Sequence, residues 1–131
     1  GLFNSELPPS DDWDYAVRVS RKYKFYKMKQ EVVLYRTHDN QTSRKVILIN
    51  SEAEFRDKII KQYGKVGTHG ETISDQELSY RNFKSHFDFG LSHYLNGDAR
   101  IATKSFYHAI LYRPFFIKSY IFLGSSLIKL L

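Results

Sequence analysis

A helical pattern that runs from Ser74 to the end of the chain constrains the fold more than any other feature. Two turn signals interrupt it, Asn96-Gly97 and Pro114, because glycine ends helices and proline cannot continue them. We therefore predict three helices, over residues 74–95, 98–112 and 115–131. The turns between consecutive helices are short, so we expect antiparallel neighbours.

The composition excludes several classes of protein. Apolar residues make up 42% of the 131 residues and charged residues 26%, as in folded globular chains. Cysteine is absent, which excludes a disulfide framework, a thiolate zinc site and a cysteine nucleophile. Because cysteine is absent and the first residues do not form a signal peptide, we expect a cytoplasmic protein, with peripheral attachment to the cytoplasmic membrane face as an option. The net charge of +6 favours an anionic partner.

Small and aromatic residues in the first two predicted helices resemble a single tetratricopeptide repeat over about residues 83–116. Gly90 and Ala102 would let the two helices approach closely, and Phe106 would fill the space between them. Arrays that bind peptides normally need several such repeats. We therefore interpret this TPR-like hairpin as a packing unit, and residues 115–131 as the helix that caps it.

The first part of the chain has a mixed pattern. We predict a helix from about residue 12 to 24 and then a strand over residues 25–36, where alternating side chains lead into a Val-Val-Leu-Tyr run. A further helix is predicted over residues 46–63. The fold class is therefore mostly α with a small β element (α+β), with a domain boundary between residues 1–45 and a helical extension, residues 46–131.

Residues 1–43 also carry an ordered set of motifs: Gly1-Leu2-Phe3-Asn4, Asp11-Asp12-Trp13-Asp14, Arg18, and Tyr35-Arg36 followed by His38 and Ser43. In this order and spacing they resemble the acceptor-side tail of family 2 glycosyltransferases, which have the GT-A fold. The resemblance implies the C-terminal part of an enzyme that transfers a sugar, with inversion, from a nucleotide diphosphate sugar to an acceptor hydroxyl. It also implies that the nucleotide-binding half is missing, so we expect this chain to be inactive alone.

The resemblance assigns roles to five residues. Asp12 is the catalytic base that takes the proton of the acceptor hydroxyl, and its place at a helix start favours the ionised carboxylate. Asp11, Trp13 and Arg18 are substrate-binding residues in the same helix. His38 matches a residue that contacts a divalent metal, Mn²⁺ or Mg²⁺, next to the diphosphate of the parent enzyme. We expect no metal on this chain alone. The acceptor is a sugar or a lipid-linked sugar.

Simpler interpretations of the same residues stay open. The acids near residue 12 are also good helix caps, and Asp14 with Arg18 is a typical helix-surface pair. A first alternative function is a non-enzymatic TPR-like module that contacts a protein or a membrane, because residues 115–131 are strongly apolar. A second is a nucleic-acid-binding domain that uses the cations of residues 18–29, which alternate with aromatic rings. We favour a solvated surface for this cluster and expect no nucleic-acid partner.

Overall fold

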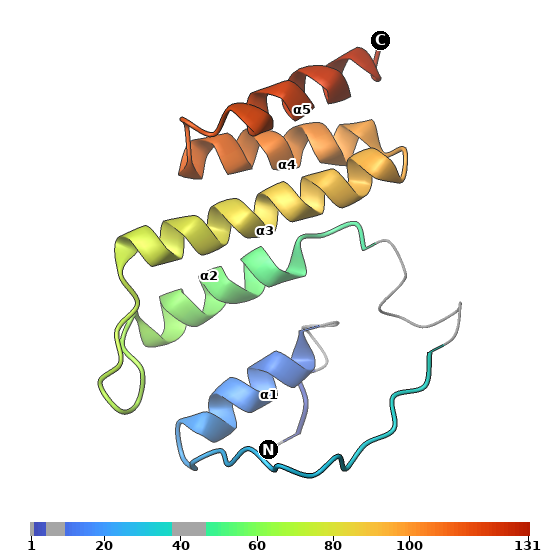
Figure 1. Ribbon diagram of the computed structural model, residues 1–131. Helices are drawn as coiled ribbons and strands as arrows, with labels where there is room; N and C mark the ends of the chain where they lie inside the picture. Colours follow the sequence, from blue (N-terminus) through green and yellow to red (C-terminus); the bar gives the residue numbers. More distant parts are fainter. Residues whose placement is uncertain (1, 5–9, 38–46) are drawn as a thin grey trace. The chain divides into compact units, whose positions relative to one another are not determined.

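The computed structural model describes residues 2–4, 10–37 and 47–131. These residues form five helices: α1 (Asp11–Ser20), α2 (Ser51–Tyr63), α3 (Asp75–Leu95), α4 (Ala99–Tyr112) and α5 (Ile117–Ile128) (Figure 1). The chain divides into two compact units, Gly1–Ile47 with α1 and Leu48–Leu131 with α2 to α5. Within the described residues, no helix combines the length and the apolar character that crossing a membrane requires.

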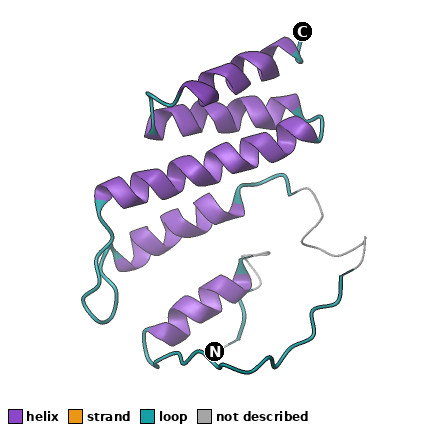
Figure 2. Ribbon diagram, viewed as in Figure 1, coloured by secondary structure: helices purple, strands orange, loops and turns teal. Residues whose placement is uncertain are grey.

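The predicted β element is wrong, and with it the α+β fold class. Figure 2 shows helices and loops but no strand in the part of the chain that the structure describes. A strand needs a neighbouring strand to pair its N–H and C=O groups. No described segment pairs in this way with residues 25–37, so their alternating pattern expresses side-chain preference without a ladder. An isolated bridge joins Val66 and Thr72 in the loop between α2 and α3.

The helical hairpin formed by α3 and α4 is confirmed. Each helix has a side-chain cap at its start: Ser74 Oγ accepts from the Glu77 amide, and Asp98 Oδ1 accepts from the Ile101 amide. Gly97 adopts a φ of +88° in the turn, a conformation that disfavours residues with a Cβ. The hydroxyl of Ser79, near the start of α3, donates to the carbonyl of Tyr112 at the end of α4, as antiparallel packing requires.

Small residues let α3 and α4 approach closely, as predicted. Phe106 and Ala102 of α4 are fully buried. A Cβ atom added to Gly90 of α3 would lie 3.0 Å from Cε1 of Phe106 and 3.1 Å from Cβ of Ser105. Any side chain larger than the hydrogen atom of Gly90 would therefore clash with the Phe106 ring.

Five phenylalanine rings form the core between α3, α4 and α5. Ring centroids lie 5.6 Å apart for Phe87 and Phe106, 5.4 Å for Phe106 and Phe122, and 5.4 Å for Phe87 and Phe116. Phe83 joins them with its ring 4.9 Å from that of Phe116. Offset and edge-to-face contacts at such distances are favourable beyond simple burial.

The inner face of α5 carries small polar residues. Ser119 and Ser126 are fully buried against the rest of the unit. The hydroxyl of Thr103 in α4 lies 2.8 Å from that of Ser126, which donates to the carbonyl of Leu123. The structure gives α5 no side-chain cap at its first turn. Phe122 packs on the Phe106 ring, but the side chains of α5 that are fully buried against the rest of the unit are short ones.

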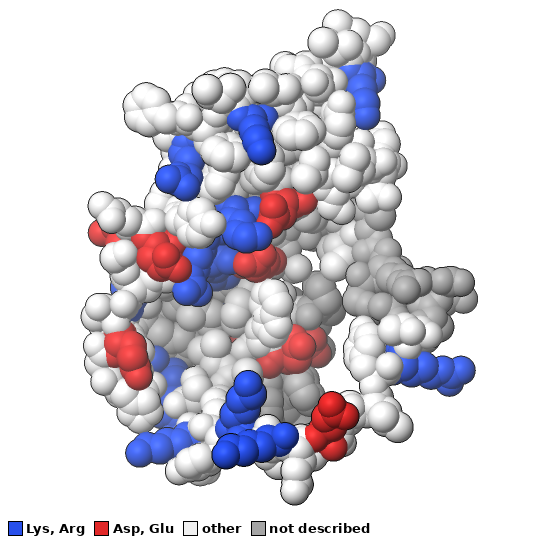
Figure 3. Space-filling model, viewed as in Figure 1, with Lys and Arg blue, Asp and Glu red and all other residues white. Residues whose placement is uncertain are grey.

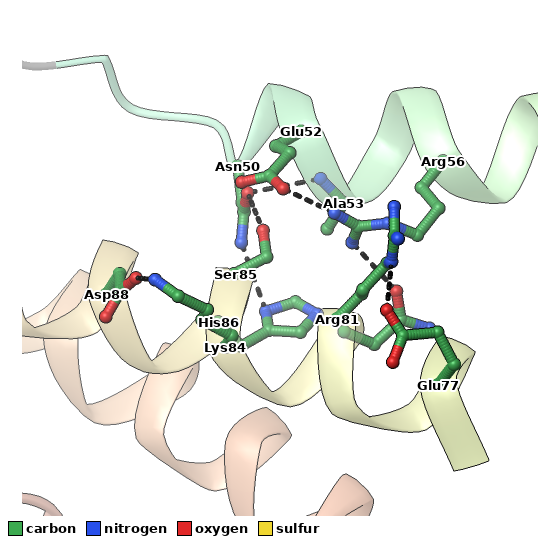
Figure 4. A network of polar contacts seen from close by, with 11 residues as sticks. Asn50, Glu52, Ala53, Arg56, Glu77, Arg81, Lys84, Ser85, His86 and Asp88 are labelled. Carbon is green, nitrogen blue, oxygen red and sulfur yellow. Dashed lines mark hydrogen bonds and ion pairs between the residues drawn. The ribbon is translucent and has the colours of Figure 1, made fainter.

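Polar contacts attach α2 to α3 (Figure 4). Asn50 caps α2 by accepting from the Ala53 amide at 3.2 Å, and its side-chain oxygen also accepts from the Ser85 hydroxyl at 3.0 Å. One turn further along α2, Arg56 donates to the side-chain oxygen of Asn82 at 2.9 Å. The start of α2 is thus fixed on α3 by hydrogen bonds from both helices.

Candidate functional site

The residues to which the resemblance assigns catalysis and substrate binding lie on α1. Asp11 and Asp12 are in its first turn. The Asp12 side chain is exposed, and its Oδ1 accepts a hydrogen bond from the Trp13 amide at 2.8 Å. The Trp13 indole is about half exposed. The start of α1 therefore presents a carboxylate and an aromatic ring side by side to solvent, within the positive end of the helix dipole.

Asp14 differs from the acids that precede it. It is only 5% exposed, and its Oδ2 accepts from Nε of Arg18 at 2.8 Å. A second guanidinium nitrogen of Arg18 donates to the carbonyl of Leu2, also at 2.8 Å. The ring of Phe3 packs on that of Tyr15 with centroids 4.9 Å apart. The Arg18 hydrogen bond and the ring contact hold Leu2 and Phe3 on α1, so Arg18 does more than form the helix-surface pair that its spacing from Asp14 predicts.

Arg18 thus has two structural partners, Asp14 and Leu2, where the resemblance makes it a substrate-binding residue. The structure brings Asp11, Asp12 and Trp13 together at one helix end. His38, the predicted metal contact, lies outside the described residues.

Across residues 2–4, 10–37 and 47–131, no three carboxylate or imidazole side chains gather closely enough to hold a metal ion. The proposal below therefore includes no step at a metal.

The basic cluster of residues 18–29 is exposed beyond the end of α1. From Arg21 to Lys29 every side chain is exposed, including the rings of Tyr23, Phe25 and Tyr26. The helix ends at Ser20, earlier than predicted, and a segment of turns, bends and loop without regular secondary structure follows up to residue 37. A solvated surface and a binding surface both require this exposure, so the structure leaves the two interpretations of the cluster open.

A cavity of about 430 Å³ lies within the helical unit, between α2, α3 and α4. Polar and ionisable side chains from all three helices line much of it: Asn50, Glu54, Asp57, His86, Lys104, His108 and Tyr112. Leu48, Ile49, Phe89 and Ile101 supply apolar surface. A concave site with this volume and a few convergent polar groups is typical of small-ligand or side-chain binding.

Three stacked rings form one side of this cavity. The His86 ring lies 5.1 Å from that of His108 and 5.8 Å from that of Tyr112, nearly parallel to both. The Asn50 amide nitrogen lies 3.4 Å from Nδ1 of His86. Burial lowers the pKa of His86, and His108 lowers it further, while Asp57 acts in the opposite direction. His86 therefore favours the neutral form, whose unprotonated Nδ1 can accept from Asn50.

The sequence analysis did not identify this cavity, although it contained a signal. His86 and His108 are equally distant from Gly97, the centre of the turn between the predicted helices. Residues placed in this way face each other in an antiparallel hairpin, and Tyr112 follows His108 by one helical turn. The contribution of α2 could not be derived, because the sequence alone does not show which face of α3 it covers.

Comparisons with protein-family models, with curated proteins and with solved structures found no match for this chain. The functional interpretation therefore depends on the motifs of residues 1–43 and on the geometry described above.

Proposed function

We propose that this chain is the acceptor-side, C-terminal part of an inverting family 2 glycosyltransferase. The parent enzyme moves a sugar from a nucleotide diphosphate sugar to an acceptor hydroxyl. In this proposal α1 supplies the base, and the helical unit is an extension that follows the catalytic domain. The donor is bound by the nucleotide-binding half, so the chain alone does not transfer sugar.

The observation that carries the proposal is the contrast between Asp12 and Asp14. Asp14 is buried and paired with Arg18, so it serves the structure of the unit. Asp12 is exposed at the start of the same helix. Exposure is what the proposed role requires, because a general base must reach a hydroxyl group in the acceptor.

The chemistry assigned to Asp12 is a single proton transfer. The acceptor oxygen attacks the anomeric carbon from the side opposite the diphosphate, and the bond between that carbon and the diphosphate oxygen breaks. The hydroxyl proton passes to the Asp12 carboxylate as attack proceeds. Trp13, exposed beside Asp12, offers a ring face on which an acceptor sugar can stack.

Exposed apolar side chains in the first unit support its belonging to a larger protein. Residues 23–35 leave eight large apolar side chains in solvent: Tyr23, Phe25, Tyr26, Met28, Val32, Val33, Leu34 and Tyr35. So many large apolar side chains exposed in one short segment favour contact with another protein surface. In the proposal, the catalytic half of the parent enzyme covers these side chains.

The test is Asp12→Asn in the full-length parent enzyme, with Glu31→Gln, an exposed carboxylate of the same unit outside α1, as the matched control. Loss of a general base lowers kcat by about 10²–10⁴-fold, while KM for the donor stays near that of the parent. Glu31→Gln keeps most of the activity. Both variants should unfold at the same temperature as the parent. Ordinary turnover by Asp12→Asn would remove Asp12 from the mechanism.

The cavity favours a second candidate function, a module that binds a basic side chain of another protein. Glu54 and Asp57 outnumber Lys104 among its charged lining residues, and the stacked rings offer a flat surface to a guanidinium group. N-acetyl-arginine amide is a suitable probe. Shifts in the NMR signals of His86 and His108 that disappear in Asp57→Asn would support this function, and unchanged signals at millimolar probe would exclude it.

A further inference from the structure

The outward face of α5 is apolar along its whole length. Ile117, Ile121 and Ile128 are all exposed, and their spacing places them on one line along the helix, with Gly124 between them. This isoleucine strip lies opposite the buried Ser119 and Ser126 on the helical wheel. α5 therefore directs Phe122, Ser119 and Ser126 toward the rest of the unit and leaves three isoleucines on its outward face, where an ordinary surface helix carries polar side chains.

Further apolar side chains widen the isoleucine strip. Tyr120 and Leu127 are about half exposed along one side of it. Phe115, just before the helix, and Leu131, after its end, are almost completely exposed. A contiguous apolar surface of this kind marks a site of contact with a protein or a membrane.

The segment that carries this surface has charges of one sign. Residues 99–131 contain five cations and no aspartate or glutamate: Arg100, Lys104, Arg113, Lys118 and Lys129. All five are exposed, but they do not share one face, because Lys118 and Lys129 belong to α5 and its end, whereas Lys104 lines the cavity between α2, α3 and α4. Figure 3 shows Lys and Arg but no Asp or Glu at the top of the view, where α4 and α5 lie. Lys129 also contacts α3, with its Nζ 3.6 Å above the ring centre of Tyr94.

We propose that α5 binds to the surface of an anionic lipid bilayer. The isoleucine strip enters the boundary between headgroups and acyl chains, and Lys118 and Lys129, which belong to α5 and its end, face the lipid phosphates. With 12 residues, α5 is about 18 Å long, shorter than a hydrocarbon core of about 30 Å, so it lies along the surface. The proposal is independent of the glycosyltransferase function.

Charge and shape together favour a bilayer over other occupants. A packed helix from another protein would cover the isoleucine strip but gives no reason for five cations without a single acid. A nucleic acid would match the cations but gives no reason for three exposed isoleucines. An anionic bilayer explains both the cations and the exposed isoleucines, because its phosphate groups attract cations and its acyl chains accept apolar side chains.

A single fluorophore provides the first test. Because the chain has no cysteine, Gly124→Cys creates a unique thiol in the middle of the isoleucine strip, and a Cβ at Gly124 meets no atom within 4 Å. An environment-sensitive dye on this thiol should brighten and shift to the blue with vesicles of phosphatidylcholine and phosphatidylglycerol, but not with phosphatidylcholine alone. The same dye on Val66→Cys should not respond. Equal responses at both positions, or none, would overturn the proposal.

A matched pair of variants provides the second test. Ile121 is 59% exposed and Val66 is 54% exposed, so neither change to aspartate disturbs a core. In sedimentation of the 131-residue chain with the mixed vesicles, Ile121→Asp should weaken binding by about tenfold or more, whereas Val66→Asp should bind like the parent. Binding should also weaken as salt is raised.

Three outcomes would contradict the lipid proposal. Unchanged vesicle binding by Ile121→Asp would assign the contact to charge alone. A parent chain that is dimeric without lipid and becomes monomeric in Ile121→Asp would make the strip an interface between copies. A blue shift of the dye at position 124 with duplex DNA, equal to that with vesicles, would identify a general polyanion surface.

Discussion

The close contact between α3 and α4 at Gly90 leads to a sharp prediction about stability. In an exposed helix, replacing glycine by alanine stabilises by about 1 kcal/mol, because glycine loses more conformational freedom on folding. At Gly90 the new methyl group would lie 3.0 Å from Cε1 and 3.1 Å from Cδ1 of Phe106. The Phe106 ring is fully buried against Phe87 and Phe122, so it has little room to move.

Overpacking of this kind costs about 1–3 kcal/mol. We therefore expect Gly90→Ala to destabilise the helical unit by a net of about 0–2 kcal/mol, after the gain of about 1 kcal/mol in helix propensity. Gly124→Ala in α5 is the matched control, because nothing lies within 4 Å of its added Cβ. This control should gain about 1 kcal/mol, so the two variants should differ by about 1–3 kcal/mol.

The assay is thermal unfolding followed by far-UV circular dichroism. For a domain of this size, 1 kcal/mol corresponds to about 4–8 °C in Tm, so Gly90→Ala should melt at least about 4 °C below Gly124→Ala. Phe106→Leu should cost less in the Gly90→Ala background than in the parent, because the smaller side chain relieves the contact. If Gly90→Ala melted as high as Gly124→Ala, this packing would not be what holds α3 and α4 together.

Three further predictions concern other contacts. The Ser119 hydroxyl is buried without a hydrogen-bond partner among the described residues, so Ser119→Ala should raise stability by about 1 kcal/mol; a lower Tm would reveal a partner. Because burial lowers the pKa of His86 from its ordinary 6.5, the unfolded chain takes up this proton first, and stability should fall as the pH drops below about 6.5. His86→Gln should flatten that fall in urea titrations at several pH values, and an unchanged slope would mean that other groups cause it. Asp14→Asn should destabilise the first unit by about 1–3 kcal/mol, toward the lower end because the Arg18 side chain is 34% exposed. Trp13 is the single tryptophan of the chain and reports this unfolding by fluorescence, so an unshifted transition would show that the ion pair contributes nothing.

The hairpin could be predicted from the sequence because its signals are local. Asn96, Gly97 and Pro114 fix where the helices end, and residues that follow a short turn must pack on those that precede it. Gly90 and Phe106 then identify the closest approach. The end of α3 at Leu95 and the end of α4 at Tyr112 agree with the prediction.

The strand prediction failed for the opposite reason. Alternating side chains at residues 25–36 indicate a preference for an extended backbone, but this segment is an exposed loop with a bend at residues 29–30. A strand also needs a partner that only long-range structure provides. The position of α2 likewise depends on contacts from Asn50 and Arg56 to α3 that no local pattern encodes.

The candidate site on α1 could be predicted only in part. The sequence places Asp12 and Asp14 on one helix, but their spacing does not reveal that one is exposed while the other is buried beneath Arg18. Arg18, which pairs with Asp14, also donates to the carbonyl of Leu2, sixteen residues earlier, a long-range contact that the spacing does not predict. The resemblance suggests the role of Asp12, and the structure adds that Asp12 is exposed whereas Asp14 is buried.

The serine-lined inner face of α5 has a consequence for local motion. Phe122 packs on the Phe106 ring, but the fully buried side chains of α5 are the small Ser119 and Ser126, so opening its last two turns should require less free energy than opening α3 or α4. In native-state hydrogen exchange, amides in the last two turns of α5 should therefore exchange well before those around Phe106. A surface that engages the outer isoleucines would slow this exchange, which makes the C-terminal helix the natural reporter of contact with a membrane.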